Sequence, residues 1–193
     1  VYWQVGRPAE AIATLEKALA TGIADDDIRI RLGTFLAESG NPAKGIALLA
    51  ASPADDVEAQ TALGIAYGQA GKDADALAAF DRALAVDGTN GIALQNIGTI
   101  WLRQNKIADA EVAVRKALDA DPALANAYTT LGVILQRKGQ MDAAIESWRR
   151  APSRFPPSRK VSTRPHSLRS EPAASMVTAK NAFMAISIHE LLN

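Results

Sequence analysis

The chain has 193 residues, a formal net charge of zero, 5% aromatic residues and no cysteine. The lack of cysteine excludes disulfides, zinc–thiolate sites and a thiol nucleophile, and no apolar run approaches the roughly 20 residues that span a membrane. The part up to Ala151 has 15 basic and 19 acidic residues (−4) and the part after it 6 basic and 2 acidic residues (+4), so neither part is basic enough to indicate a nucleic-acid partner.

The first 23 residues are predicted to form part of a helical unit. The chain begins at Val1, and Tyr2 already stands where the first helix of such a unit should end. We therefore expect the chain to have been cut from a longer one. A signal peptide upstream would then be missing, so localisation is unknown, with cytoplasm and periplasm both open.

The following residues, up to Ala151, repeat themselves. The pair Leu131-Gly132 returns earlier in the chain as Ile97-Gly98, and again at the same interval as Leu63-Gly64. A slightly shorter interval leads back to Leu32-Gly33. A period of about 34 residues is typical of stacked helical repeats. We expect four such units after the partial one, over residues 26–56, 57–90, 91–124 and 125–151.

Each unit is predicted to contain two helices separated by a turn. In the unit 57–90, Gly71 is predicted to end the first helix in the left-handed conformation, and Asp73 to cap the second through its carboxylate. Other units have similar signals: Asn41-Pro42 as an N-cap and first helical residue, Asn105 as a left-handed turn residue, and Asp121-Pro122 at the start of the next pair.

Small residues recur where the two helices of a unit should cross. They let the backbones approach, and large side chains are predicted to fill the space around them. The small residues are Gly64, Gly98 and Gly132 on the first helices, and Ala76, Ala110 and Ala144 on the second. The surrounding core residues are Tyr67, Phe80, Trp101 and Trp148.

This pattern resembles the tetratricopeptide repeat. The last unit matches it with Tyr128, Leu131, Gly132, Leu135, Ala144, Trp148, Ala151 and Pro156, and the two units before it match at equivalent positions. The unit at 26–56 has Gly45 where alanine is usual and is three residues short. The resemblance covers about residues 1–151 and implies an all-α fold, a right-handed α-solenoid of stacked antiparallel helix pairs.

The repeat pattern stops after Ala151. Half of residues 152–181 are Pro, Ser or Arg, a composition typical of a disordered tail or linker. A natural basic linker, an out-of-frame or mis-assembled end, and a basic docking segment all fit it. Residues 182–193 have the spacing of a short helix, which is expected to cover the last helix pair unless another chain or missing repeats do so. Self-association through this uncapped end also fits.

The sequence offers little catalytic chemistry. The two histidines, His166 and His189, both lie in the tail. The carboxylates of Asp73, Asp75, Asp109 and Asp142 stand at helix starts, where they complement the helix dipole. The run Asp25–Asp27 lacks the ligand spacing of a calcium loop. We predict no enzyme activity, no cofactor and no metal site.

The remaining candidate is a binding surface. The resemblance implies that the first helices line a concave groove for a peptide or helix of a partner protein. Helical spacing selects these residues as the peptide-binding face: Thr61, Ile65, Gln69, Gln95, Asn96, Thr99, Arg103, Thr129, Thr130, Val133 and Arg137, with Ile30, Thr34 and Glu38 in the earlier unit. Family members that clamp a chaperone C-terminus use Lys and Asn here, and only Asn96 resembles that clamp.

The predicted function is a non-catalytic scaffold for protein–protein interaction. The alternative is the accessory repeat region of a larger enzyme, with a sulfatase-like, glycosyltransferase or kinase domain before Val1. The Ala-rich units resemble those of bacterial chains, in which repeats are appended to such domains. In both cases this chain itself binds a partner and catalyses nothing.

Overall fold

The computed structural model describes residues 8–21 and 25–151, and within these ranges it contains only α-helices. The fold is an all-α solenoid, which confirms the predicted class. The helices are α1 (Pro8–Ala20), α2 (Asp26–Glu38), α3 (Pro42–Leu49), α4 (Val57–Gln69), α5 (Asp73–Val86), α6 (Gly91–Arg103), α7 (Ile107–Ala120), α8 (Ala125–Arg137) and α9 (Met141–Arg150).

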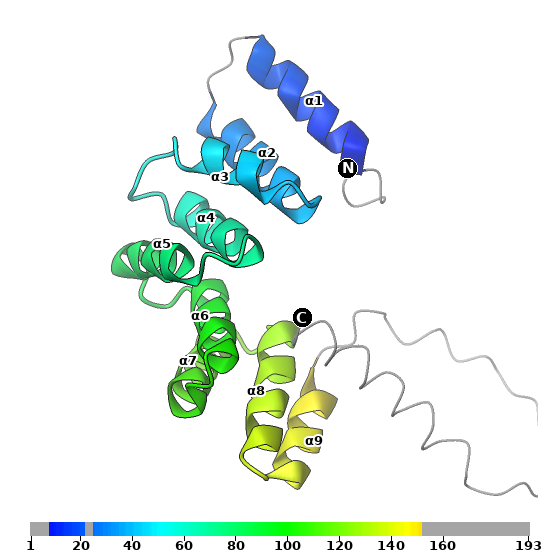
Figure 1. The fold of residues 1–193 in the computed structure, drawn as a ribbon, viewed down its shortest axis with the longest axis vertical. Helices are drawn as coiled ribbons and strands as arrows, with labels where there is room; N and C mark the ends of the chain where they lie inside the picture. The colour runs from blue at the N-terminus through cyan, green and yellow to red at the C-terminus, as the bar shows by residue number, and fades with distance from the viewer. Residues whose placement is uncertain (1–7, 22–24, 152–193) are drawn as a thin grey trace, which may run out of the picture.

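The helices form antiparallel pairs that stack into a curved array (Figure 1). The pairs are α2 with α3, α4 with α5, α6 with α7, and α8 with α9. Figure 1 shows α4 and α6 on the inner side of the arc, with α5 and α7 outside them. Neighbouring first helices also contact each other, α4 with α6 and α6 with α8, so the inner surface is a row of first helices.

One type of turn joins the two helices of every complete pair. Its central residue has a positive φ: 85° at Gly40, 71° at Gly71, 60° at Asn105 and 76° at Gly139. The next N–H bonds a carbonyl five residues back, as from Lys106 to Trp101 at 2.8 Å. These bonds satisfy the last carbonyls of the first helix. The predictions for Gly71 and Asn105 are confirmed.

Two predicted helix starts need correction, and a third is confirmed in position. Lys72 occupies the N-cap position of α5 without a side-chain capping bond, and Asp73 is already the first helical residue, so Asp73 is no N-cap. Asn41 does occupy the N-cap of α3 and is followed by Pro42, but its side chain makes no capping bond. Asp121 ends α7, and Leu124 is the N-cap of α8. At α3 and α5 the tight turn within the pair already places the backbone, so these helices form without a side-chain cap.

Close packing at the crossing points explains the repeated glycines. A Cβ added at Gly64 would lie 2.5 Å from the Phe80 ring, and one at Gly98 would lie 2.5 Å from Val114 Cγ2. At Gly132 it would overlap the indole of Trp148. The facing residues Ala76, Ala110 and Ala144 are completely buried. The helices of a pair therefore approach too closely for any side chain at these glycines.

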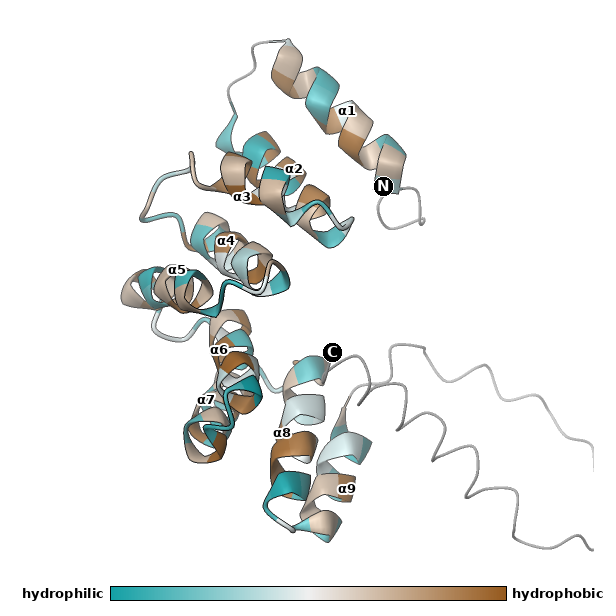
Figure 2. Cartoon of the chain, viewed as in Figure 1, coloured by the Kyte–Doolittle hydropathy of each residue, from teal (hydrophilic) through white to brown (hydrophobic). Residues whose placement is uncertain are grey.

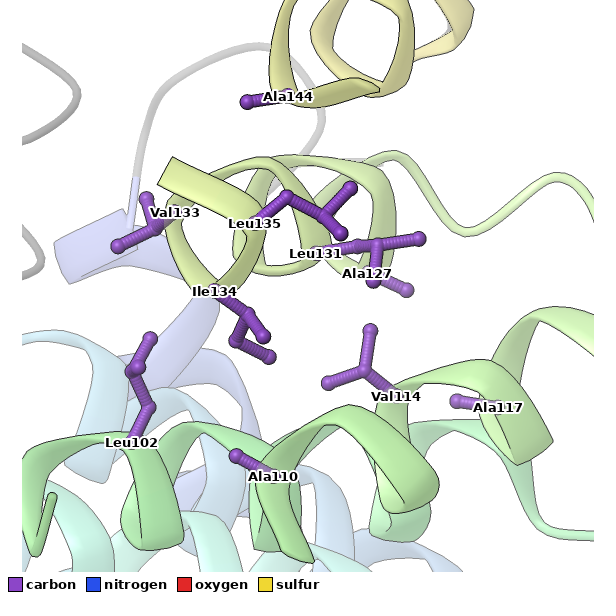
Figure 3. Close-up of a cluster of buried hydrophobic side chains, with 10 residues drawn as sticks. All are labelled: Leu102, Ala110, Val114, Ala117, Ala127, Leu131, Val133, Ile134, Leu135 and Ala144. Carbon is purple, nitrogen blue, oxygen red and sulfur yellow. The ribbon is translucent and has the colours of Figure 1, made fainter. Parts of the chain in front are cut away.

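The core of the described residues consists of three clusters of buried side chains along the stack. Figure 2 shows hydrophobic residues, in brown, distributed over the helices of the whole array. Figure 3 shows the cluster between the third and fourth pairs, to which Leu102, Val114 and Ile134 belong. In it, Leu102 reaches from α6 toward α8. Each pair thus also packs against the next pair in the chain, as expected of a solenoid.

Several predictions fall outside the described residues. They concern Tyr2 and the first residues of the partial unit, Pro156, both histidines, the tail at 152–181 and the helix at 182–193 with its docking. The described part of the partial unit is α1, and the four pairs α2–α3 to α8–α9 lie inside the predicted ranges of the later units.

Candidate binding groove

A hollow opens between α4 and α6 on the inner surface of the arc. Its volume is about 210 Å³. Five of the predicted groove residues line it together: Ile65, Gln69, Asn96, Thr99 and Arg103. The other lining residues are Gly64, Gly68, Phe80 and Ile100. The hollow therefore has an apolar floor and polar side chains along its α6 side.

Local hydrogen bonds orient the polar side chains of α6. Gln95 Nε2 donates to Thr99 Oγ1 at 3.0 Å, and Thr99 Oγ1 donates in turn to the Gln95 carbonyl at 3.1 Å. Asn96 Nδ2 donates to the Ile92 carbonyl at 2.8 Å. Because the Asn96 amide group is held by its nitrogen, its oxygen is left as an acceptor at the rim of the hollow.

Arg103 closes one end of the hollow and is held by an ion pair. Its Nη2 bonds Asp73 Oδ1, although the two residues belong to neighbouring pairs. Asp73 is the first residue of α5, where a carboxylate also suits the helix dipole. Both side chains stay partly exposed, 41% for Arg103 and 27% for Asp73. A guanidinium has five N–H donors, so Arg103 is fixed in place and still offers donors to a ligand.

Four predicted groove residues are buried instead of exposed, Ile30 among them. Thr61 is 7% exposed, Thr130 is 1% exposed and Val133 is 4% exposed. Asn90, which begins α6, donates to Thr61 Oγ1 at 3.2 Å and so covers it. Val133 belongs to the core cluster of Leu102. For Thr61 and Val133 the physical reason is that residues of the neighbouring first helix pack directly on these positions.

The predicted residues of α8 do not join the hollow. Arg137 Nη1 donates to the Leu102 carbonyl at 3.0 Å, so its guanidinium caps the end of α6. Thr129 is half-buried, and its hydroxyl donates to the Ala125 carbonyl at 3.2 Å. The Thr129 carbonyl accepts the indole N–H of Trp148 at 3.2 Å. In the first complete pair, Ile30 is only 3% exposed, whereas Thr34 is half-buried and Glu38 exposed.

Sequence reasoning missed three residues that shape the groove and one exposed apolar residue close to it in the sequence. Gly68 and Ile100 line its floor, and Asp73 positions Arg103. Ile92 is 48% exposed and lies one turn before Asn96 on α6. The spacing of Ile92, four residues before Asn96, would have placed it on the same face. Nothing in the local sequence distinguishes Gly68 from the glycines at helix crossings.

A second hollow, of about 480 Å³, lies near the N-terminal end between α1, α2 and α3. Apolar residues such as Leu19, Leu36 and Leu48 line most of it, with Glu16 and Lys44 as its charged members. Among the described residues, no cluster of His, Asp or Glu has the geometry of a metal site. The helices of the same part of the chain are too short or too polar to cross a membrane.

Models of the tetratricopeptide repeat match most of the sequence, one over residues 2–66 and another over residues 61–125 and 96–159. The chain belongs to the tetratricopeptide repeat family. In general terms it is thus a scaffold for protein interactions, and the repeats of this family are typically non-catalytic. No curated protein sequence matches the chain.

Several solved structures are similar to this repeat array. A crystal structure of MamA has a TM-score of 0.62 at 23% identity, over 78% of this chain and 90% of MamA. MamA from Desulfovibrio magneticus RS-1 has a TM-score of 0.63 at 19% identity, over 78% of this chain and 86% of that MamA chain. PilF from Pseudomonas aeruginosa has a TM-score of 0.60 at 21% identity, over 65% of this chain and 59% of PilF. At these identities the similarity shows a shared fold.

Proposed function

We propose that the groove between α4 and α6 binds a polypeptide segment of a partner protein. The observation that carries the proposal is the hollow in which Ile65, Gln69, Asn96, Thr99 and Arg103 meet. Its volume of about 210 Å³ is below the roughly 300–1,000 Å³ of small-molecule sites. The hollow therefore suits one part of a larger ligand that continues along the inner surface.

The polar groups around the hollow match an extended peptide. The Asn96 amide oxygen accepts, and the Gln69 amide, which is exposed, both donates and accepts. Arg103 offers charge-assisted hydrogen bonds to a carbonyl or carboxylate. A peptide backbone presents alternating donors and acceptors, so these groups serve orientation while the floor supplies apolar contact.

Display of random peptides of about ten residues against the immobilised chain tests this proposal. Binders are then measured on a groove variant, Gln69→Ala with Asn96→Ala and Arg103→Ala. A matched control changes three exposed residues of α5 and α7: Asp81→Ala, Lys116→Ala and Asp119→Ala. We expect at least about tenfold weaker binding for the groove variant and none of this loss for the control. Equal binding by both variants would contradict the proposal.

A second candidate function is self-association through α9. Met141 is 46% exposed and Ile145 is 38% exposed on this last described helix. One repeat earlier, Glu111 occupies the position of Ile145 and contacts the following pair through Lys138. Sedimentation at increasing concentration tests it, with Met141→Gln and Ile145→Glu as the variant. A mass that stays monomeric at all concentrations contradicts it.

The accessory role beside a catalytic domain stays a prediction. Reading the parent gene upstream of Val1 tests it directly. An encoded catalytic domain supports it, and further repeats or a start codon contradict it.

A further inference from the structure

The hollow between α4 and α6 exists because a side chain is missing there. One repeat period along the chain, Leu102 is the equivalent of Gly68, and Val133 is the equivalent of Thr99. Leu102 and Val133 are 4% exposed each and belong to one core cluster, which fills the space between α6 and α8. Between α4 and α6 the same two positions hold Gly68 and Thr99, and both line the open hollow.

Neither packing nor backbone conformation requires glycine at Gly68. A Cβ added there would meet nothing within 4 Å, and its φ lies outside the positive range. Gly64, one turn earlier on α4, differs because its Cβ would strike the Phe80 ring. Glycine in a helix lowers stability relative to alanine. The effect of Gly68 is thus to keep space open above Phe80 and Ile100.

We propose that this space is a subsite for one large apolar side chain of the partner peptide, of leucine size, which takes the place that Leu102 fills in the next step of the solenoid. The inference rests on the proposed function of the groove and names the residue type it selects. Apolar side chains gain free energy in proportion to the area they remove from water. Ile65, which is half-buried, supplies the accessible apolar surface, and the buried Phe80 and Ile100 lie beneath it.

The polar rim of the hollow restricts which peptide residues can stand next to the inserted apolar side chain. Arg103 stands at the end of the hollow, anchored by Asp73. Because the Arg103–Asp73 pair is neutral overall, it recognises a neighbouring residue through the free N–H donors of Arg103, which bond an acceptor such as a carboxylate. The geometry therefore favours a leucine-like residue next to a residue with a hydrogen-bond acceptor.

The test uses short peptides of defined sequence and NMR titration of the full chain. The first peptide is acetyl-Gly-Gly-Leu-Asp-Gly-Gly-amide, and its controls replace Leu by Ala, or Asp by Lys. Affinities near 1 mM are sufficient for detection. We expect the Leu peptide to shift the signals of Gly68, Thr99 and Ile100. We expect at least about tenfold weaker binding when Leu is replaced by Ala.

The variant Gly68→Leu reproduces the residue of the next step. We expect it to abolish the shifts at Thr99 and Ile100 while the melting temperature stays equal or rises, since the added side chain enters open space. Gly68→Ala should weaken binding less. A melting temperature lowered by Gly68→Leu would show that the space is not available, and this result would overturn the inference.

The outcomes also separate this inference from the proposed function. If displayed peptides bind the groove but Leu and Ala peptides bind equally, the subsite is wrong and the groove assignment stands. If neither displayed nor synthetic peptides shift any residue of α4 or α6, both are wrong.

Discussion

Lys138 Nζ donates a hydrogen bond to Glu111 Oε2 at 2.6 Å and so ties the end of α8 to α7. Arg115, one turn along α7, also bonds Glu111 at 2.8 Å. The hydrogen bonds from Lys138 and Arg115 lower the pKa of the Glu111 carboxyl, even though partial burial opposes them. The two cations thus favour the charged carboxylate in the folded state.

The lowered pKa of Glu111 predicts a pH-dependent contribution to stability. The contribution is fully present above the ordinary glutamate pKa of about 4.3 and is lost as pH falls through the lower pKa of the folded state. Because Lys138 is 37% exposed and Arg115 55% exposed, we expect at most about 1 kcal/mol. Urea unfolding of the native chain and Glu111→Gln at pH 7 and pH 3 checks it. A difference that is the same at both pH values would contradict it.

Gly132→Ala should destabilise the last pair. The new Cβ would overlap the Trp148 indole, which is also held by its bond to the Thr129 carbonyl. We expect a loss of about 1–3 kcal/mol in the free energy of unfolding. Gly68→Ala is the matched control, since its Cβ meets nothing, and it should gain up to about 1 kcal/mol. Similar losses for both variants would refute the packing explanation.

Asn105→Ala should be destabilising where Asn105→Gly is not. The residue has a φ of 60°, which alanine adopts at a cost of roughly 1–2 kcal/mol and glycine without strain. Chemical unfolding of both variants measures this difference. Gln104→Ala changes the exposed neighbour and should have little effect. The idea fails if Ala and Gly are equally stable at this position.

Leu102→Ala should open a second hollow, between α6 and α8. Leu102 is 4% exposed and packs in the cluster of Val133 and Ile134. We expect a loss of about 2–5 kcal/mol in the free energy of unfolding. Thermal and urea unfolding measure it, and NMR of the Val133 methyl groups shows whether the cavity is hydrated. A loss below about 1 kcal/mol would mean that α6 and α8 move together around the smaller residue and leave no cavity.

Much of the fold was predictable because it depends on short-range spacing. The glycines at 64, 98 and 132 and the turn residues Gly71 and Asn105 act within one helix pair, and their roles follow from the repeat. Asp73 was misread for a different reason. A carboxylate at a helix start suits a cap, yet its partner is Arg103, 30 residues away, and local rules do not reach that contact.

The candidate groove was predictable only in outline. Helical spacing placed Ile65, Asn96 and Arg103 on the inner face, and they do line one hollow. The same spacing also selected Val133, which is buried against Leu102. One period earlier, glycine stands at position 68 in place of this leucine, and Thr99 lines the hollow. Whether an inner position is open depends on the residue that faces it from the neighbouring pair.

The sequence by itself determined the all-α class, the period of the units, the turns between paired helices and the small residues at their crossings. All of these follow from interactions within about one period of the chain. Only the tertiary structure decided which inner residues stay accessible, because accessibility depends on the side chain that faces each position from the neighbouring pair. The hollow beside Gly68 and the filled space around Leu102 arise from the same repeat pattern. The difference is the volume of one side chain, and its effect appears only when the next helix is packed against it.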